Sequence, residues 1–358
     1  MFFNKHAVPE RREGRVTWKC PSNIAILKYW GKRFEQLPVN PSLSMTLTSA
    51  FTETTVSFEY SPGSKNHTVD FYFEGIRDQK FASRVQKYLE RIALIYPAIG
   101  DCRFHIESSN SFPHSSGIAS SASAMSALAL SISSIFNNSE EDDDRFLDRA
   151  SYLARIGSGS AARSVYGGWT LWGETPEVYG SSNDYALPLN DIIHDDFRDM
   201  RDAILIVSSG SKEVSSSAGH QLMEQHFYRE GRLSQTSARL IALLGSLRKG
   251  HFDDFIRITE NEALSLHGLM MSSDPSYILL KPETLQIISK IRQFREQFQI
   301  PVCFTLDAGP NVHLIYPGKV LNEVTDFIKK ELLPLCEKGE WIDDQIGNGP
   351  EKLKQDYA

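Results

Sequence analysis

The stretch SFPHSSGIASSASAMSALAL, residues 111–130, places small hydroxyl residues and Gly117 ahead of an apolar helical pattern, with no Asp, Glu, Lys or Arg. Two structures suit this composition: a flexible low-complexity linker, or a loop whose backbone amides close around an anion where a helix begins. Tight packing of a helix start against a sheet is a third explanation. The stretch contains neither GxxxxGK[ST] nor GxGxxG, which excludes a Walker P-loop and a dinucleotide fingerprint.

The composition is that of a globular chain that lacks an obvious nucleic-acid or membrane surface. Of 358 residues, 41% are apolar and 23% are charged, and the formal net charge is −7. We therefore expect no nucleic-acid partner. No apolar run approaches the roughly 20 residues of a membrane helix, so no membrane partner is expected. The N-terminus has no apolar signal core, and four dispersed cysteines suit a reducing cytoplasm.

The order of predicted elements indicates an α+β fold. Residues 42–60 have the Thr, Val and Phe content of one or two strands, and residues 81–96 have helical spacing. Two long helices are predicted near 215–248 and 252–270. Because strands and helices alternate without regular βαβ repeats, α+β is favoured over α/β. A soft boundary near 190–200 divides the chain into predicted domains 1–195 and 196–358.

A second glycine- and serine-rich stretch carries an arginine. RIGSGSAARSVYGG spans residues 155–168, and Arg163 follows Ser160 by three residues. If a helix starts there, the two side chains share one face. A guanidinium beside helix-terminal amides suits a carboxylate or phosphate, which it can bind bidentately. A surface arginine after an ordinary turn is the alternative.

Two further stretches contain chemically useful groups. SNIAILKYWGKR, residues 22–33, brings two lysines and an aromatic pair together, either around a phosphorylated small molecule or on an edge strand with solvated lysines. FTLDAGPNVHLIY, residues 304–316, places Asp307 between an apolar strand and turn residues. That carboxylate either caps the turn or, in a cleft, orients or deprotonates a substrate hydroxyl.

Taken together, five motifs resemble those of mevalonate diphosphate decarboxylases of the GHMP kinase superfamily. The motifs are NIAILKYWGKR, NPSLSMTL, FPHSSGIASSASA, RIGSGSAARSVYGG and FTLDAGPN. The resemblance covers almost the whole chain. It implies an N-terminal domain like the second domain of ribosomal protein S5, a ferredoxin-like C-terminal domain, and ATP and substrate in the cleft between them. It also implies Mg²⁺, a homodimer, and ATP-dependent conversion of mevalonate 5-diphosphate to isopentenyl diphosphate with release of ADP, phosphate and CO₂.

The resemblance also implies roles for individual residues. Asp307 would act at the substrate's 3-hydroxyl with Lys28 beside it, and Arg163, placed by Asn23, would hold the substrate carboxylate. The other implied substrate contacts are Tyr29, Lys32, Ser160, Ser216 and His220. The implied ATP-phosphate contacts are Ser115, Ser116, Gly117, Ala119, Ser120 and Ser121, with Ser121 also at the metal.

Some positions depart from the family pattern and keep other functions open. His114 and Ser115 replace part of a Thr-Ala-Ala-Gly-Leu loop, Pro41 stands where serine is frequent, and His220 stands where methionine is common. A polar helix residue near the cleft is one explanation of His220, and a diphosphate contact is the other. The alternative functions are a mevalonate 3-kinase, a monophosphate decarboxylase, and a non-catalytic GHMP-fold binding protein.

Overall fold

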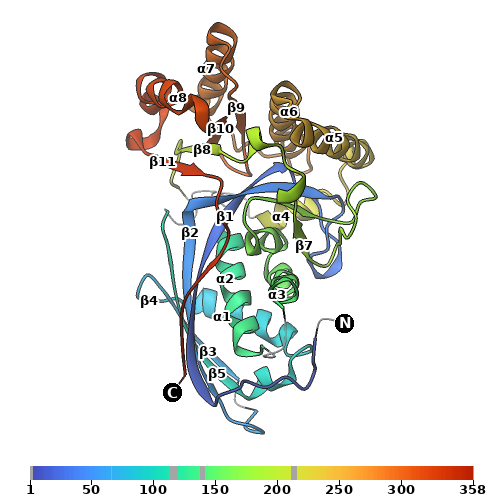
Figure 1. Cartoon of the computed structure of the whole chain (residues 1–358), viewed down its shortest axis with the longest axis vertical. Coiled ribbons are helices and arrows are strands. Elements are labelled where there is room, and N and C mark those ends of the chain that lie inside the picture. Colours follow the sequence, from blue (N-terminus) through green and yellow to red (C-terminus); the bar gives the residue numbers. More distant parts are fainter. Residues whose placement is uncertain (1–2, 66, 113–119, 138–141, 211–215, 358) are drawn as a thin grey trace.

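One large sheet forms the lower half of the molecule in Figure 1. The computed structural model describes residues 3–65, 67–112, 120–137, 142–210 and 216–357. The strand order is β12-β1-β2-β5-β3-β4, with β6 paired to β2 and β7 to β6. All of these pairs are antiparallel except β3 with β5. The strands are β1 (Glu13–Leu27), β2 (Ser42–Tyr60), β3 (Thr68–Phe73), β4 (Ile76–Arg77), β5 (Cys102–Asn110), β6 (Trp169–Trp172), β7 (Ala186–Pro188) and β12 (Glu351–Tyr357).

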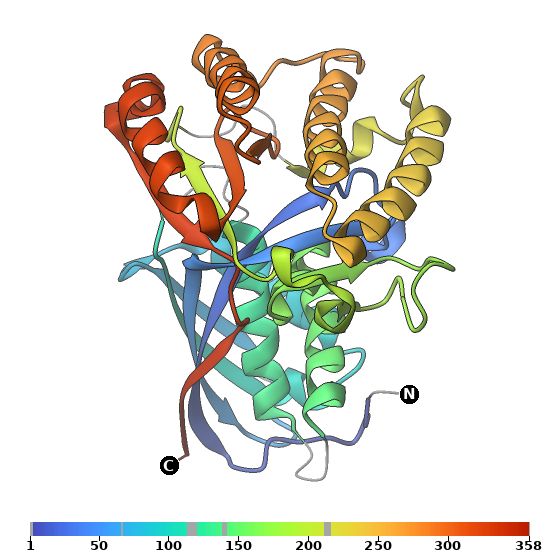
Figure 2. The same ribbon diagram turned by 45° about the horizontal axis from the view of Figure 1, so that its top comes forward.

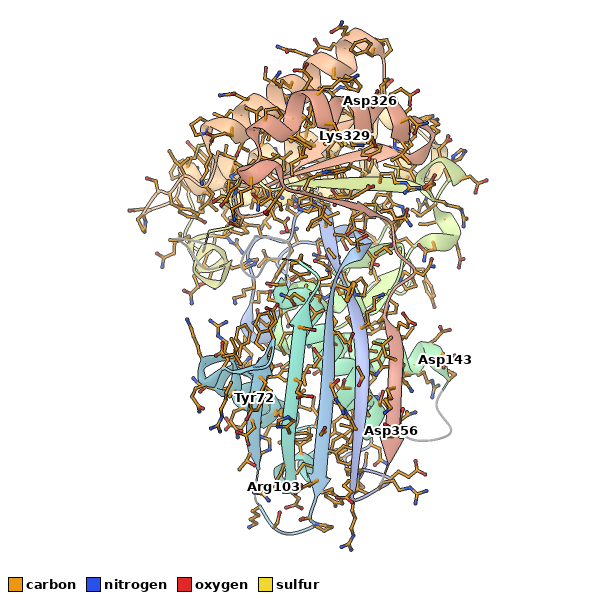
Figure 3. The ribbon with its side chains drawn as sticks, turned by 90° about the vertical axis from the view of Figure 1, so that its left-hand side faces the viewer. Tyr72, Arg103, Asp143, Asp326, Lys329 and Asp356 are labelled. Carbon is orange, nitrogen blue, oxygen red and sulfur yellow. The ribbon has the colours of Figure 1, made fainter. Side chains whose placement is uncertain are left out.

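Three helices cover one face of this sheet: α1 (Gln79–Ile92), α2 (Ser120–Ile135) and α3 (Asp143–Gly157). In α1 the carboxylate of Asp78 accepts hydrogen bonds from the first-turn amides of Lys80 and Phe81, which caps the helix. Figure 3 shows the strands of this sheet face on, with Tyr72 on β3 and Asp356 on β12 at opposite edges of the view.

A second, four-stranded sheet in the order β11-β8-β10-β9 forms the upper half. Its strands are β8 (Met200–Leu205), β9 (Cys303–Thr305), β10 (Val312–Pro317) and β11 (Trp341–Gln345). The helices of this half are α4 (Ser216–Leu222), α5 (Arg229–Lys249), α6 (Phe252–Met271), α7 (Pro282–Phe298) and α8 (Leu321–Phe327). The mixture of helices and sheets confirms the predicted α+β class.

The end of the chain returns to the first sheet. Strand β12 pairs antiparallel with β1, from Gly14 opposite Tyr357 to Lys19 opposite Glu351. Figure 2 shows the C-terminal segment running down beside the N-terminal strand. The domain limits 1–195 and 196–358 stay a prediction, and a division by residue number alone leaves one strand of the first sheet in the second domain.

The prediction of one helix over 215–248 is wrong, because α4 ends at Leu222 and α5 begins at Arg229. The break contains a buried histidine. Nδ1 of His226 accepts a hydrogen bond from the backbone N–H of Tyr228, and Nε2 lies 3.0 Å from the carbonyl oxygen of Leu269. The bond to Tyr228 competes locally with helical hydrogen bonding, and the bond to Leu269 is a tertiary contact with α6. None of the described helices has the length and apolar character needed to cross a bilayer.

The two halves share a hydrophobic core. Trp169 of the first sheet and Phe197, just before the second sheet, both contact the ring of Phe255 in α6, with centroid distances of 5.9 and 4.9 Å. Ile24 and Leu43, at the facing ends of β1 and β2, belong to the same cluster. The ends of β1 and β2, which flank the segment between them, are therefore packed against the second half.

We predict that Phe255→Ala lowers the free energy of unfolding by about 3–5 kcal/mol, because it leaves a cavity in this shared core. Urea unfolding followed by tryptophan fluorescence and circular dichroism measures the change. The exposed Leu285→Ala should change stability by less than about 0.5 kcal/mol. Similar losses in both variants would contradict the importance of the shared core.

Candidate active site

The centre of the candidate site is an ion pair between the two halves of the molecule. Lys28 directly follows β1, and Asp307 lies two residues after β9. Nζ of Lys28 lies 3.0 Å from Oδ1 of Asp307. The lysine side chain is 2% exposed and the aspartate side chain 27%, so the pair opens to its surroundings on the carboxylate side.

Burial and neighbouring charges act in opposite directions on Lys28. Burial lowers its pKa from the usual value, and the carboxylates of Asp307 and Glu262 partly oppose that shift. The nearby Arg163 guanidinium lowers the pKa further. Nε2 of His267 lies 3.0 Å from the backbone carbonyl oxygen of Asp307, which fixes the turn that presents the carboxylate.

Arg163 lies in the short 3-10 helix η3 (Gly159–Val165) with its side chain buried. Its Nε donates to Ser44 Oγ at 3.0 Å and to Asn23 Oδ1 at 3.3 Å, and its Nη1 donates to Ser42 Oγ. Nδ2 of Asn23 in turn donates to Ser164 Oγ at 2.8 Å. Asn23 and Arg163, predicted to act together, are thus in direct contact.

All of these acceptors are neutral, and no carboxylate within the described ranges lies at ion-pair distance from Arg163. Burial lowers the pKa of Arg163 to about 10, and the charges of Asp307 and Tyr29 oppose the shift. The guanidinium remains cationic at neutral pH. A buried cation held only by neutral oxygens is a favourable place for the carboxylate of a ligand.

Tyr29 lies between aromatic neighbours from both halves of the molecule. Its ring centroid is 4.8 Å from that of Trp172 and 4.4 Å from that of His220. A Cβ at Gly159 would lie 2.7 Å from the Tyr29 hydroxyl oxygen, so the glycine allows this close approach to the start of η3. Lys32 is partly buried, which lowers its pKa, and Arg91 adds to that shift.

Serine hydroxyls extend from η3 to the start of α2. Oγ of Ser158 lies 3.5 Å from Oγ of Ser160 and 3.5 Å from Oγ of Ser121. Ser120 and Ser121 are the first residues of α2, where helix amides have no helical partners. Within the described residues, no group of three or more His, Cys, Asp or Glu side chains could hold a metal ion.

Several predicted contacts are not tested. Ser115, Ser116, Gly117 and Ala119, with their neighbour His114, lie outside the described residues. Ser216 begins α4, and its side chain also lies outside the described part. The functional roles of all the predicted site residues stay predictions.

Sequence reasoning missed Glu262 and His267 of α6 and Asn40 of the segment between β1 and β2. Glu262 accepts a hydrogen bond from the backbone N–H of Lys28 at 3.1 Å, and Asn40 donates to the Lys28 carbonyl oxygen at 3.0 Å. One signal was available for Glu262. It stands midway between Ile258 and Leu266 at four-residue spacing, on the apolar face of the helix.

His220 of α4 is fixed as a neutral imidazole. Its Nδ1 accepts a hydrogen bond from the backbone N–H of Gly31 at 2.9 Å, which places the proton of the neutral ring on Nε2. Its ring also lies 4.9 Å from that of Trp30. Burial, together with the charge of Lys32, lowers the pKa of His220 to about 3.

Comparisons with known proteins place the whole chain in one family. Residues 20–184 match a diphosphomevalonate decarboxylase-like N-terminal domain, and residues 203–356 match a mevalonate 5-diphosphate decarboxylase C-terminal domain. A diphosphomevalonate decarboxylase of Ganoderma lucidum is 31% identical over 336 residues, which cover 88% of this chain and 82% of the relative. The chain belongs to the diphosphomevalonate decarboxylase family.

Solved structures of diphosphomevalonate decarboxylases share its fold. Mevalonate diphosphate decarboxylase from Staphylococcus aureus is 30% identical, with a TM-score of 0.81 over 96% of this chain and 98% of the other. A structure of a complex with MVAPP, AMPPCP and magnesium is 28% identical, with a TM-score of 0.80 over 96% and 99%. The predicted GHMP-type fold and family are confirmed.

We predict that the stability of this chain depends on pH through His220. Between pH 3 and 6.5 the unfolded state binds a proton at this ring that the folded state does not, so stability falls as the pH drops from 7.5 to 5. His220→Asn removes the titrating group, so the melting temperature of this variant should fall less than that of the wild type between pH 7.5 and 5. Thermal unfolding at the two pH values measures the difference.

The matched control is His105→Asn, since His105 is exposed on β5. That variant should keep the pH dependence of the wild type. An equal pH dependence in His220→Asn would contradict the burial of a neutral ring at position 220.

Proposed function

We propose that this chain uses ATP to phosphorylate the 3-hydroxyl of mevalonate 5-diphosphate and then forms isopentenyl diphosphate, releasing ADP, phosphate and CO₂. The observation that carries the proposal is the Lys28–Asp307 ion pair beside the buried Arg163, whose acceptors among the described residues are all neutral. The relatives are diphosphomevalonate decarboxylases, which supports the same reaction, and the solved complex with MVAPP, AMPPCP and magnesium supports the same ligands.

In the first step Asp307 accepts a hydrogen bond from the 3-hydroxyl and takes up its proton as the oxygen attacks the γ-phosphorus of ATP. The ammonium of Lys28 stabilises the negative charge of the carboxylate and would offset the charge of the transferred phosphoryl group. Phosphoryl transfer requires mainly positioning and charge stabilisation, and a rigid ion pair supplies both.

In the second step the C3–O bond breaks, and its electron pair leaves with the phosphate. Positive charge develops at C3, and the bond between C2 and the carboxylate carbon breaks to release CO₂. The electron pair of that bond becomes the new C=C bond. Arg163 binds the carboxylate and keeps its own proton, because its pKa of about 10 is far above that of a carboxylate. The carboxylate therefore stays ionised, as the loss of CO₂ requires. Asn23 and Ser44 keep the guanidinium in one orientation.

The substrate diphosphate is assigned to Tyr29, Lys32, Ser160, Ser216 and His220. ATP phosphates are assigned to the loop ahead of α2 and to Ser120 and Ser121. Mg²⁺ enters with ATP as part of the substrate, with Ser121 Oγ as its protein contact. The hydroxyls near the start of α2 and the first-turn amides, which have no partner within the helix, suit polyphosphate oxygens. We also propose a homodimer and a cytoplasmic location, both of which stay predictions.

A panel of three substrates tests the function. Purified protein is incubated with ATP, Mg²⁺ and either mevalonate, its 5-phosphate or its 5-diphosphate, and ADP and CO₂ are measured. We expect equal amounts of both products with the 5-diphosphate. ADP without CO₂ would show a 3-kinase, preference for the 5-phosphate a monophosphate decarboxylase, and ATP binding without turnover a binding protein. Each of these would overturn the proposal.

We predict that Asp307→Asn lowers turnover by about 10²- to 10⁴-fold, because the amide cannot take up the hydroxyl proton. ATP and substrate binding, measured by calorimetry, should change little. Asp343→Asn, at an exposed position of β11, is the matched control and should turn over like the wild type. Near-normal turnover in Asp307→Asn would remove Asp307 from this role.

A further inference from the structure

The backbone of Lys28 depends on a residue of the other half of the molecule. Lys28 follows the last residue of β1, so its backbone N–H is not part of the strand ladder. That buried donor bonds to Oε2 of Glu262 at 3.1 Å. Glu262 lies in α6, 234 residues further along the chain. Since a buried backbone N–H without an acceptor is costly, this contact restricts where the Lys28 peptide can lie.

Glu262 is itself held rigidly. Its side chain is 0% exposed, and Arg232 binds it bidentately, with both N–O distances 2.7 Å. Arg239 adds a third bond of 2.6 Å. Both arginines come from α5, so the carboxylate is fixed between two packed helices. Against the effect of burial, the two arginines lower the pKa of Glu262 and so keep its carboxylate ionised and in place. Loss of either partner would leave an uncompensated buried charge.

We propose that Glu262 is a positioning residue that holds the Lys28 peptide from the second half of the molecule and thereby sets the Lys28–Asp307 contact. The inference rests on the proposed role of Lys28 in the reaction. Glu262 is not among the site residues that the sequence predicts. The residue acts through geometry and charge, because it contacts Lys28 and not the reacting atoms.

Burial lowers the pKa of Lys28 and the charge of Glu262 opposes that shift, so the role of Glu262 can be measured separately from its effect on stability. Several charged or titratable groups face Lys28 from the elements around it: Asp307 after β9, Arg163 of η3, Glu262 and His267 of α6, and, through Glu262, Arg232 and Arg239 of α5. Of these, Glu262 and Asp307 favour the protonated ammonium. Removing the Glu262 charge therefore makes Lys28 lose its proton at lower pH.

The chain offers a matched control on the same helix. Glu260 is also a buried glutamate with two arginine partners, Arg292 at 2.9 Å and Arg295 at 2.5 Å. Because it precedes Glu262 by two residues, it projects from nearly the opposite side of α6, toward α7. Glu260→Gln and Glu262→Gln thus remove the same charge from the same kind of environment, and only the second changes the group that binds the Lys28 N–H.

The experiment compares both variants with the wild type on mevalonate 5-diphosphate and ATP across pH 6–10. We expect both to lose melting temperature. Glu262→Gln should also lower kcat by about ten- to a hundredfold, with KM for ATP nearly unchanged, because the lysine is misplaced. The alkaline limb of its kcat profile should move to lower pH by about 0.5 unit or more. Glu260→Gln should keep the kcat and alkaline limb of the wild type.

If Glu262→Gln does not yield folded protein, Glu262→Asp replaces it, since it keeps the charge and withdraws the carboxylate by one methylene. That variant should lower kcat and leave the alkaline limb in place. The same kcat and pH profile in the Glu262 and Glu260 variants, or wild-type kcat in Glu262→Asp, would overturn the role of Glu262. A wild-type protein that forms no CO₂ would instead overturn the proposed function.

Discussion

The ion pair between Lys28 and Asp307 is the interaction on which the site depends. Its partners are 279 residues apart and come from different halves of the molecule. Removing a lysine from water is expensive, and a carboxylate at 3.0 Å offsets that cost only while the geometry holds. The aromatic core around Phe255 and the bond from Lys28 to Glu262 both fix that geometry. The geometry of the reaction centre therefore depends on how the two halves of the molecule pack against each other.

Two buried arginines, Arg163 and Arg232, differ in what compensates their charge. Arg232 binds a carboxylate of the protein, so its charge is compensated before any ligand arrives. Arg163 binds hydroxyl and amide oxygens instead, which orient its guanidinium and leave its charge available. This difference explains why Arg163 suits a substrate carboxylate while Arg232 belongs to the framework. A cation oriented in advance also costs little reorganisation during decarboxylation.

Local patterns predicted much of the fold, and the family resemblance of several motifs singled out the main site residues. Period and composition indicated the α+β class, and the motifs around Lys28, Arg163 and Asp307 singled out the residues that the structure groups around one centre. The break between α4 and α5 was missed because His226 bonds to Leu269 through tertiary packing that no local pattern contains. Glu262 was missed for a similar reason, since a glutamate in a helix is ordinarily solvated and its partner is distant in sequence.

The most direct test of the account is a double-mutant cycle on kcat with Lys28→Met, Asp307→Asn and the variant that combines them. If the two side chains act as one unit, each single change removes most of the rate, and the double variant is no slower than the slower single variant. Losses that multiply in the double variant would show two independent contributions. That result would contradict an ion pair at the centre of the reaction.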